Sequence, residues 1–143
     1  MDFEILQRFG WLFREVNVGF RECIDAALKR NRVSLTFGQV STLSILSTQP
    51  GLNGAQLARR NMVTPQAMTG MLRQLATLGL VERRDHPESL RADSWHVTAK
   101  GEKQLARGRV AFAEATEKML SALSPQEVAT LQGYLQRCSR AFD

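Results

Sequence analysis

The sequence predicts a mainly helical protein with one small β-hairpin towards the end of its central region. Both end segments carry apolar residues at alternating spacings of three and four, which is typical of long amphipathic helices. The central region, residues 34–98, holds shorter apolar segments separated by breakers such as Gln49-Pro50-Gly51. Two short strand-like segments then flank a polar loop that contains Pro87. Long helices at both ends therefore bracket a compact centre.

A single helix is predicted over residues 3–30. Its apolar residues form a heptad seam, whose members are Leu6, Phe9, Phe13, Val16, Phe20, Cys23 and Ala27. At about 1.5 Å per residue such a helix is about 40 Å long, roughly the diameter of a domain of this size. One chain would struggle to cover the whole seam.

Three shorter helices are expected next. The first spans residues 35–47, and its inward side chains are Val40, Leu43 and Leu46. The second spans residues 54–60 behind Asn53, a good N-cap, and is expected to bury Ala55, Leu57 and Ala58. After a tight turn at residues 61–63, Thr64 caps a third helix that has Pro65 in its first position and ends at Gly79.

The third of these helices has two different faces. Its apolar face consists of Met68, Met71, Leu72 and Leu75. Its opposite face consists of Gln66, Thr69, Gly70, Arg73 and Thr77. Every residue of that outer face is neutral or positive and most can form hydrogen bonds, so it suits a polyanionic partner.

The remaining elements are a hairpin and two helices. Strands are expected at residues 80–84 and 94–98. Thr98 then caps a helix over residues 99–123, whose expected inward side chains are Leu105, Phe112, Met119 and Leu123. Ser124 and Glu127 form a capping box for the last helix. That helix carries a second apolar seam of Val128, Leu131, Leu135, Cys138 and Phe142.

Charge is distributed unevenly along the chain. The stretch from Ala26 to Val81 contains no Asp or Glu, and its basic residues are Lys29, Arg30, Arg32, Arg59, Arg60 and Arg73. The whole chain has a net charge of +5 and a pI near 9.9. Phosphates repel carboxylates and release counterions to Lys and Arg. Helix, short helix, tight turn, helix and hairpin, in this order, predict a winged helix-turn-helix that binds DNA.

Other classes of protein are disfavoured. Two cysteines are too few for a disulfide framework, and the N-terminus resembles no signal peptide, so we expect a cytoplasmic protein. No apolar run reaches the length of a membrane span. We find no catalytic triad and no Gly-rich phosphate loop, and expect neither an enzyme nor a cofactor. His86 and His96 with two distant cysteines make no metal motif, so no metal site is expected.

An ordered set of motifs resembles the MarR family of transcriptional regulators. The matching segments are Leu35-Thr36-Phe37-Gly38-Gln39, Gly54-Ala55-Gln56-Leu57-Ala58, Val63-Thr64-Pro65-Gln66-Ala67-Met68-Thr69, Leu78-Gly79-Leu80-Val81-Glu82-Arg83 and Val97-Thr98-Ala99-Lys100-Gly101. The resemblance implies one domain over residues 1–143. Residues 1–33 and 99–143 would be dimerisation helices, and residues 34–98 the DNA-binding lobe. It further implies a homodimer, more typical of a repressor than an activator, on a pseudo-palindromic operator.

Candidate DNA contacts follow from the helix faces and from this resemblance. On the third central helix we select Thr64, Gln66, Thr69 and Arg73, and as backbone contacts Gln56 and Arg84. The resemblance adds Arg91, which matches an arginine that enters the minor groove from the tip of the hairpin. Ser89 stands where that family has an acid, and Leu90 replaces a frequent second arginine. Glu88 or Asp93 is then the substitute for the missing carboxylate.

Three alternatives stay open. Trp11, Arg14 and Phe37, with Phe13 and Trp95, either line a pocket for a small-molecule effector, such as the aromatic acids that many MarR relatives bind, or are core residues. Cys23 and Cys138 are buried small hydrophobes or oxidant sensors. Finally, a winged helix can serve as a protein-interaction module without specific DNA binding.

Overall fold

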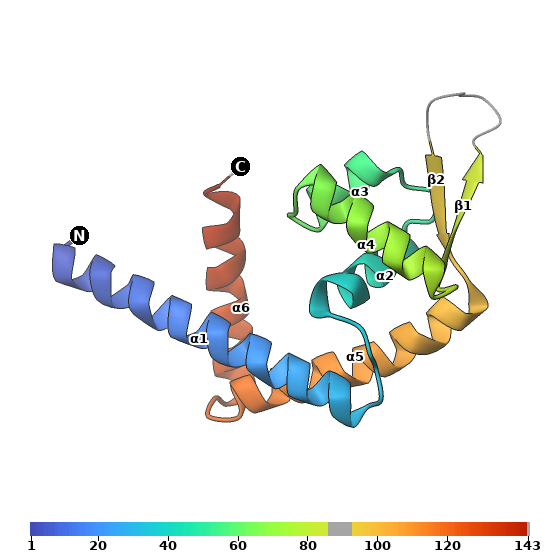
Figure 1. Cartoon of the computed structure of the whole chain (residues 1–143). Coiled ribbons are helices and arrows are strands. Elements are labelled where there is room, and N and C mark those ends of the chain that lie inside the picture. The colour runs from blue at the N-terminus through green and yellow to red at the C-terminus, as the bar shows by residue number, and fades with distance from the viewer. Residues whose placement is uncertain (86–92, 143) are drawn as a thin grey trace.

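The computed structural model describes residues 1–85 and 93–142 and contains six helices and a two-stranded antiparallel sheet within them. The helices are α1 (Phe3–Arg30), α2 (Phe37–Thr48), α3 (Gly54–Arg60), α4 (Pro65–Thr77), α5 (Ala99–Leu120) and α6 (Pro125–Arg140). The strands are β1 (Val81–Asp85) and β2 (Asp93–Val97). The central helices and the hairpin form one lobe, while α1 and α6 extend from it on the other side (Figure 1). The predicted winged helix-turn-helix between long helices is confirmed.

Local capping signals explain where most of the helices begin. Thr36, Asn53, Thr64, Thr98 and Ser124 each occupy an N-cap in extended conformation, and each side chain accepts a hydrogen bond from a backbone N–H in the first turn. Such a bond satisfies one of the backbone donors that a helix start leaves unpaired. In α2, α3 and α6 the reciprocal bond of a capping box is also present.

The core lies where α2, α3, α4 and the N-terminal half of α5 meet the C-terminal part of α1. Its fully buried side chains include Ile24, Leu43, Leu46, Leu57, Met68, Leu75 and Leu105. Most of these were expected from helical periodicity. Thr42 is also fully buried, and its hydroxyl donates to the Gly38 carbonyl oxygen. The core therefore holds the three short helices and α5 as one unit.

Strand β2 joins the hairpin to the segment after α2. In the β1–β2 register, Val81 pairs with Val97 and Arg83 with Trp95. On its other edge, Trp95 donates its backbone N–H to Leu52 O and accepts from Gly51 N at its own carbonyl. Gly51 has a φ of +88°, a conformation that glycine adopts without strain. Both backbone groups of Trp95 thus bond to residues 51–52, on the edge of β2 that faces away from β1.

The prediction that the apolar faces of the end helices are buried is partly wrong for a single chain. Phe112, Met119 and Leu123 are exposed, and α5 ends at Leu120. Cys138 is exposed rather than buried, Cys23 is half-buried, and α6, which ends before Phe142, has no buried residue. The physical reason is that one chain supplies nothing to pack against them. Ala55 is also exposed, because it lies on the outer side of α3.

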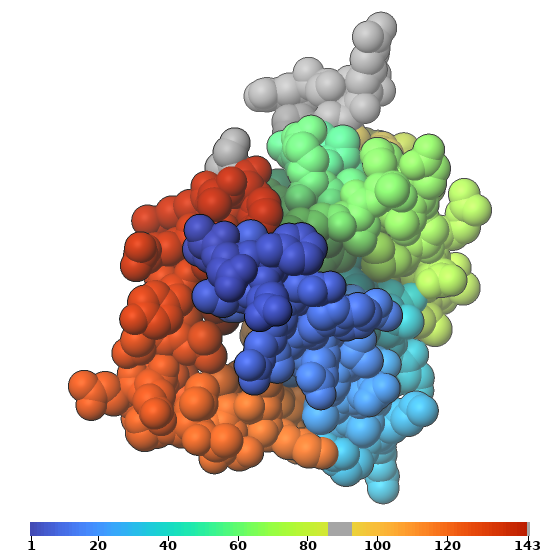
Figure 2. All heavy atoms as spheres, turned by 90° about the vertical axis from the view of Figure 1, so that its left-hand side faces the viewer, coloured from blue at the N-terminus to red at the C-terminus, as the bar shows by residue number. Residues whose placement is uncertain are grey.

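The N-terminal half of α1 shows the same exposure. Phe3, Leu6, Phe9, Phe13 and Val16 are all more than half exposed, whereas Ile24, Ala27 and Leu28 near its end are buried. Figure 2 shows the face of the molecule on which the N-terminal half of α1 and the whole of α6 lie. Within the described residues, no helix has an apolar stretch that could cross a membrane.

Candidate nucleic-acid interface

Helix α4 presents a polar face to solvent, as predicted. Gln66, Thr69 and Arg73 are exposed along it, and Thr64 accepts the Ala67 N–H at 3.1 Å as the N-cap. Its apolar side is anchored by Met68, Leu72 and Leu75, which are all buried. The exposed face therefore has a defined orientation relative to the core.

Two side-chain amides fix α4 and the preceding turn against α2. Gln39, which is buried, donates to Gln74 Oε1 at 2.7 Å and accepts from Thr36 N. Asn61, in the turn between α3 and α4, donates to Gly38 O and accepts from the Ser41 hydroxyl at 2.6 Å. A buried amide with its partners satisfied holds a fixed geometry. The helix-turn-helix is thus rigid where α4 enters it.

Some predicted contacts already have partners within the chain. The Thr69 hydroxyl donates to Pro65 O at 2.9 Å, so its oxygen lone pairs remain as acceptors. Gln56 is half-buried, and its Oε1 accepts the Asn53 N–H in the capping box of α3. Its amide NH₂ group is the part that a phosphate could use.

The hairpin places its two strand arginines on opposite faces. Arg83 shares a face with the buried Val81, because side chains alternate along a strand. Arg83, Asp93 and Trp95 line a cleft of about 420 Å³ whose other wall is α4, and the α4 residues there include Thr69, Arg73 and Thr77. Arg84 lies on the other face, within 2.6 Å of Glu82. The sequence-based selection named Arg84 and did not name Arg83, although alternation from Val81 places Arg83 on the side of α4.

An ion pair joins the two strands near the loop end of the hairpin. Arg83 Nη2 lies 2.6 Å from Asp93 Oδ1, and both side chains are about half exposed. Asp93 is therefore already engaged and is not a free substitute for the missing acid near Arg91. Arg91 itself, with Ser89, Leu90, Glu88 and His86, lies outside the described residues.

His96 lies on the same hairpin face as Arg84. Partial burial, and after it the charge of Arg84, lower the pKa of His96, while the carboxylate of Glu82 acts in the opposite direction. The Ser94 hydroxyl lies 2.8 Å from His96 Nε2. Protonation of His96 is therefore disfavoured relative to a free imidazole, and the basic side chains among the described hairpin residues are Arg83 and Arg84.

A second pocket lies between α2 and α5. It has a volume of about 330 Å³ and is lined by Phe37, Val40, Ser41, Ser44, Leu105, Gly108, Arg109 and Phe112. The rings of Phe37 and Phe112 are stacked with centroids 6.2 Å apart. Of the three predicted pocket residues, only Phe37 lines this pocket. Trp11 and Arg14 pair with each other on the exposed part of α1, with the guanidinium 5.7 Å from the ring centroid.

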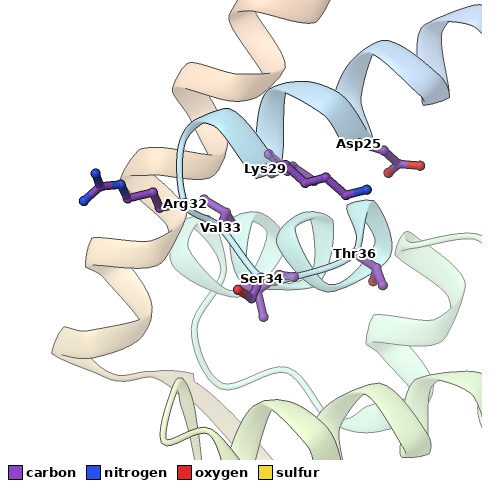
Figure 3. Close-up of a pocket in the computed structure, with 8 residues that line it drawn as sticks. Asp25, Lys29, Arg32, Val33, Ser34 and Thr36 are labelled. Atoms are coloured by element: carbon purple, nitrogen blue, oxygen red, sulfur yellow. The ribbon is translucent and has the colours of Figure 1, made fainter.

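A third hollow, at the junction of α1 and α2, brings no functional cluster together. Its lining includes Asp25 and Lys29 of α1 and the connecting residues 32–36. Lys29 extends towards Asp25, while Arg32 points away in the opposite direction (Figure 3). The two positive charges therefore do not converge on one point.

The chain is similar to known DNA-binding regulators over most of its length. Residues 35–92 match the sequence model of the MarR family. The HTH-type transcriptional repressor Rv2887 of Mycobacterium tuberculosis is 35% identical over 119 residues, which are 82% of this chain and 84% of that protein. The Mycobacterium bovis repressor Mb2911 gives the same values.

Solved structures have the same fold. Rv2887 in complex with DNA has a TM-score of 0.75 and 30% identity, over 90% of this chain and 95% of that one. Rv2887 with salicylic acid has a TM-score of 0.73 and 32% identity, over 90% and 94%. A mutant MarR from E. coli complexed with operator DNA has a TM-score of 0.84 over 96% and 99%, but at 23% identity it supports the fold alone.

Proposed function

Because this chain belongs to the MarR family, we propose that it is a homodimeric transcriptional repressor that binds double-stranded DNA through α4 and the hairpin. Each subunit would place α4 in one major groove, and the two-fold symmetry of the dimer would select an inverted repeat. The end helices, residues 1–33 and 99–143, would form the contact between the two subunits.

One observation carries the proposal. The fixed outer face of α4, with Gln66, Thr69 and Arg73, is exposed on a lobe whose three short helices contain no acidic residue. Amide and hydroxyl groups suit base edges, and arginine suits phosphate or guanine. The repressor names of the relatives support the regulatory sign.

Selection from random duplex DNA tests the function. The purified protein should retain an inverted repeat whose half-sites are centred about ten base pairs, one helical turn, apart. Retention without any common motif, or no retention at low salt, would contradict sequence-specific repression. Of these two outcomes, no retention at low salt would also favour the interaction-module hypothesis.

The hairpin contacts give a first prediction. We assign the cleft beside α4, which Arg83 and Arg73 line from its two walls, to the phosphate backbone. Replacing Arg83 with Ala should therefore weaken binding to the selected operator about tenfold, although Arg83 also pairs with Asp93. If Arg83 neutralises a phosphate, the slope of log affinity against log salt should also fall by about 1. Arg84→Ala is the matched control, and its affinity should fall less than about threefold. Fluorescence anisotropy at several salt concentrations measures both.

The opposite ranking would show that the hairpin meets DNA with its other face. If Arg84→Ala costs more affinity than Arg83→Ala, the assignment of the cleft to the phosphate backbone is wrong. Gel filtration of both variants, which should elute like the parent protein, checks that neither has lost its fold.

We further propose that the pocket between α2 and α5 binds a small aromatic acid that releases the DNA. Rv2887 has been solved with salicylic acid. In this chain the aromatic ring would lie against Phe37 and Phe112, and the carboxylate would pair with the Arg109 guanidinium. A ligand wedged between α2 and α5 would change their spacing and so favour a dimer that mismatches the operator.

Arg109 tests this site. Arg109→Met should weaken sodium salicylate binding about tenfold to a hundredfold, since a hydrogen bond to a charged group contributes about 1.5–3 kcal/mol. The control is Arg107→Met, an exposed arginine of the same helix that does not line the pocket. Isothermal titration calorimetry measures both. Equal affinities in the two variants would place the ligand elsewhere.

A further inference from the structure

The first turn of α5 is hydrogen-bonded to the residues at which α4 ends. Lys100 Nζ donates to the carbonyl oxygen of Leu78, the C-cap residue of α4, at 2.9 Å. The Thr98 hydroxyl donates to Gly79 O at 2.6 Å and accepts from Gly101 N, so one side chain caps α5 and holds the end of α4. These carbonyls belong to the negative end of the α4 dipole, which an ammonium group stabilises.

Close backbone packing fixes the position of these contacts between α5 and the end of α4. Thr98 also donates its backbone N–H to Leu80 O at 3.0 Å. A Cβ added to Gly101 would lie 2.1 Å from that same oxygen, so only glycine permits the approach. We call the contacts of Thr98, Lys100 and Gly101 with residues 78–80 the clasp.

The C-terminal part of α5 contacts the end of α1. Glu114 accepts hydrogen bonds from Arg30 and Asn31 at the end of α1. Between this point and the clasp, α5 lines the α2–α5 pocket with Leu105, Gly108, Arg109 and Phe112. One continuous helix, α5, thus connects the C-terminal end of α1 to the end of α4 (Figure 1).

We propose that Lys100 and Thr98 are positioning residues that tie the orientation of α4 to that of α5. The clasp touches the end of α4 opposite to the end that carries Thr64 and Gln66. Through the clasp, a tilt of α5 changes the orientation of the exposed face of α4, and Lys100 itself makes no contact with DNA. This inference rests on the proposed DNA-binding function and specifies how its geometry is set.

Lys100→Met is the central test, with Lys103→Met as its matched control. Both variants lose one positive charge from an exposed lysine of α5, and Lys103 lies one turn further from α4. Operator affinity should fall about fivefold for Lys100→Met, near the low end of typical coupling effects, and less than twofold for Lys103→Met. The salt slope should stay unchanged in Lys100→Met, whereas loss of a phosphate contact would lower it by about 1.

Two further measurements separate positioning from general stability. Amide hydrogen exchange should accelerate at residues 74–80 of Lys100→Met and stay unchanged in the core of α2. Lys100→Arg, which keeps a donor at this position, should restore affinity. Salicylate should also release Lys100→Met from the operator less effectively than the parent protein, because the tilt of α5 is no longer passed to α4.

The outcomes distinguish the two proposals. If the parent protein selects no operator, the function itself fails. If the parent binds specifically while Lys100→Met matches Lys103→Met in affinity and in salicylate response, the clasp inference is overturned and the function stands. A reduced salt slope in Lys100→Met would also overturn it, by making Lys100 a direct phosphate contact.

Discussion

Replacing Gly101 with Ala should lower the free energy of unfolding by about 2–4 kcal/mol. The added methyl group would lie 2.1 Å from Leu80 O and 2.6 Å from Val97 Cγ1. Leu80 O is a backbone atom that already accepts the Thr98 N–H, so it cannot move without breaking that bond. Overpacking costs about 1–3 kcal/mol and more where backbone must shift, and the better helix propensity of Ala returns at most about 1 kcal/mol.

Gly70→Ala provides the control for this prediction. Gly70 is also helical, but a Cβ there would meet nothing within 4 Å. This variant should be unchanged or more stable by up to about 1 kcal/mol. Urea denaturation followed by circular dichroism compares the two. A Gly101→Ala variant as stable as the parent protein would mean that α5 does not pack as closely on residue 80 as the structure indicates.

The fold was predictable because its signals are local. Thr36, Asn53, Thr64, Thr98 and Ser124 each mark a helix start through a hydrogen bond to a backbone group within three residues. Such a bond depends on the nearby chain alone. The outer face of α4 was equally predictable, since helical periodicity separates Met68, Leu72 and Leu75 from their polar neighbours.

The candidate site was predicted less completely because its contacts are long-range. Whether Arg83 or Arg84 faces α4 depends on the side of the hairpin that packs on the core, and neighbouring residues of a strand point to opposite sides. Arg109 and Phe112 of α5 lie beside Phe37 of α2 only because these two helices, which are far apart in sequence, pack against each other. The clasp depends likewise on the meeting of α4 and α5.

The apolar seam of α1 was predicted correctly as a pattern, but a single chain buries only part of it. Of its members, Ala27 is buried and Phe20 and Cys23 are partly buried against the core, whereas Phe9 is 63% exposed. Heptad periodicity reports that a face is apolar and does not report which chain covers it. The exposed half of α1 and the whole of α6 therefore raise the question of a second subunit.

Replacing Phe9 with Glu should convert a dimer into a monomer and abolish operator binding. In the proposed dimer, the partner subunit covers the Phe9 side chain, and burying a phenylalanine side chain contributes about 1.5–3 kcal/mol. An unpaired carboxylate in its place adds a desolvation penalty. Symmetry makes each effect occur twice, so the dimer dissociation constant should rise at least about 1000-fold.

Val18→Glu is the matched control, because it introduces the same charge on the other side of the same helix. Val18 is 49% exposed and lies nine residues from Phe9, about two and a half helical turns, so the two side chains point in opposite directions. Light scattering should give twice the 16.0 kDa chain mass for the parent protein and for Val18→Glu, and the single-chain mass for Phe9→Glu. A Phe9→Glu variant that stays dimeric would show that the heptad seam of α1 is covered by something other than a second copy. If Phe9→Glu is monomeric and still binds the operator with parental affinity, then α4 recognises a single half-site, and the symmetry argument for an inverted repeat fails.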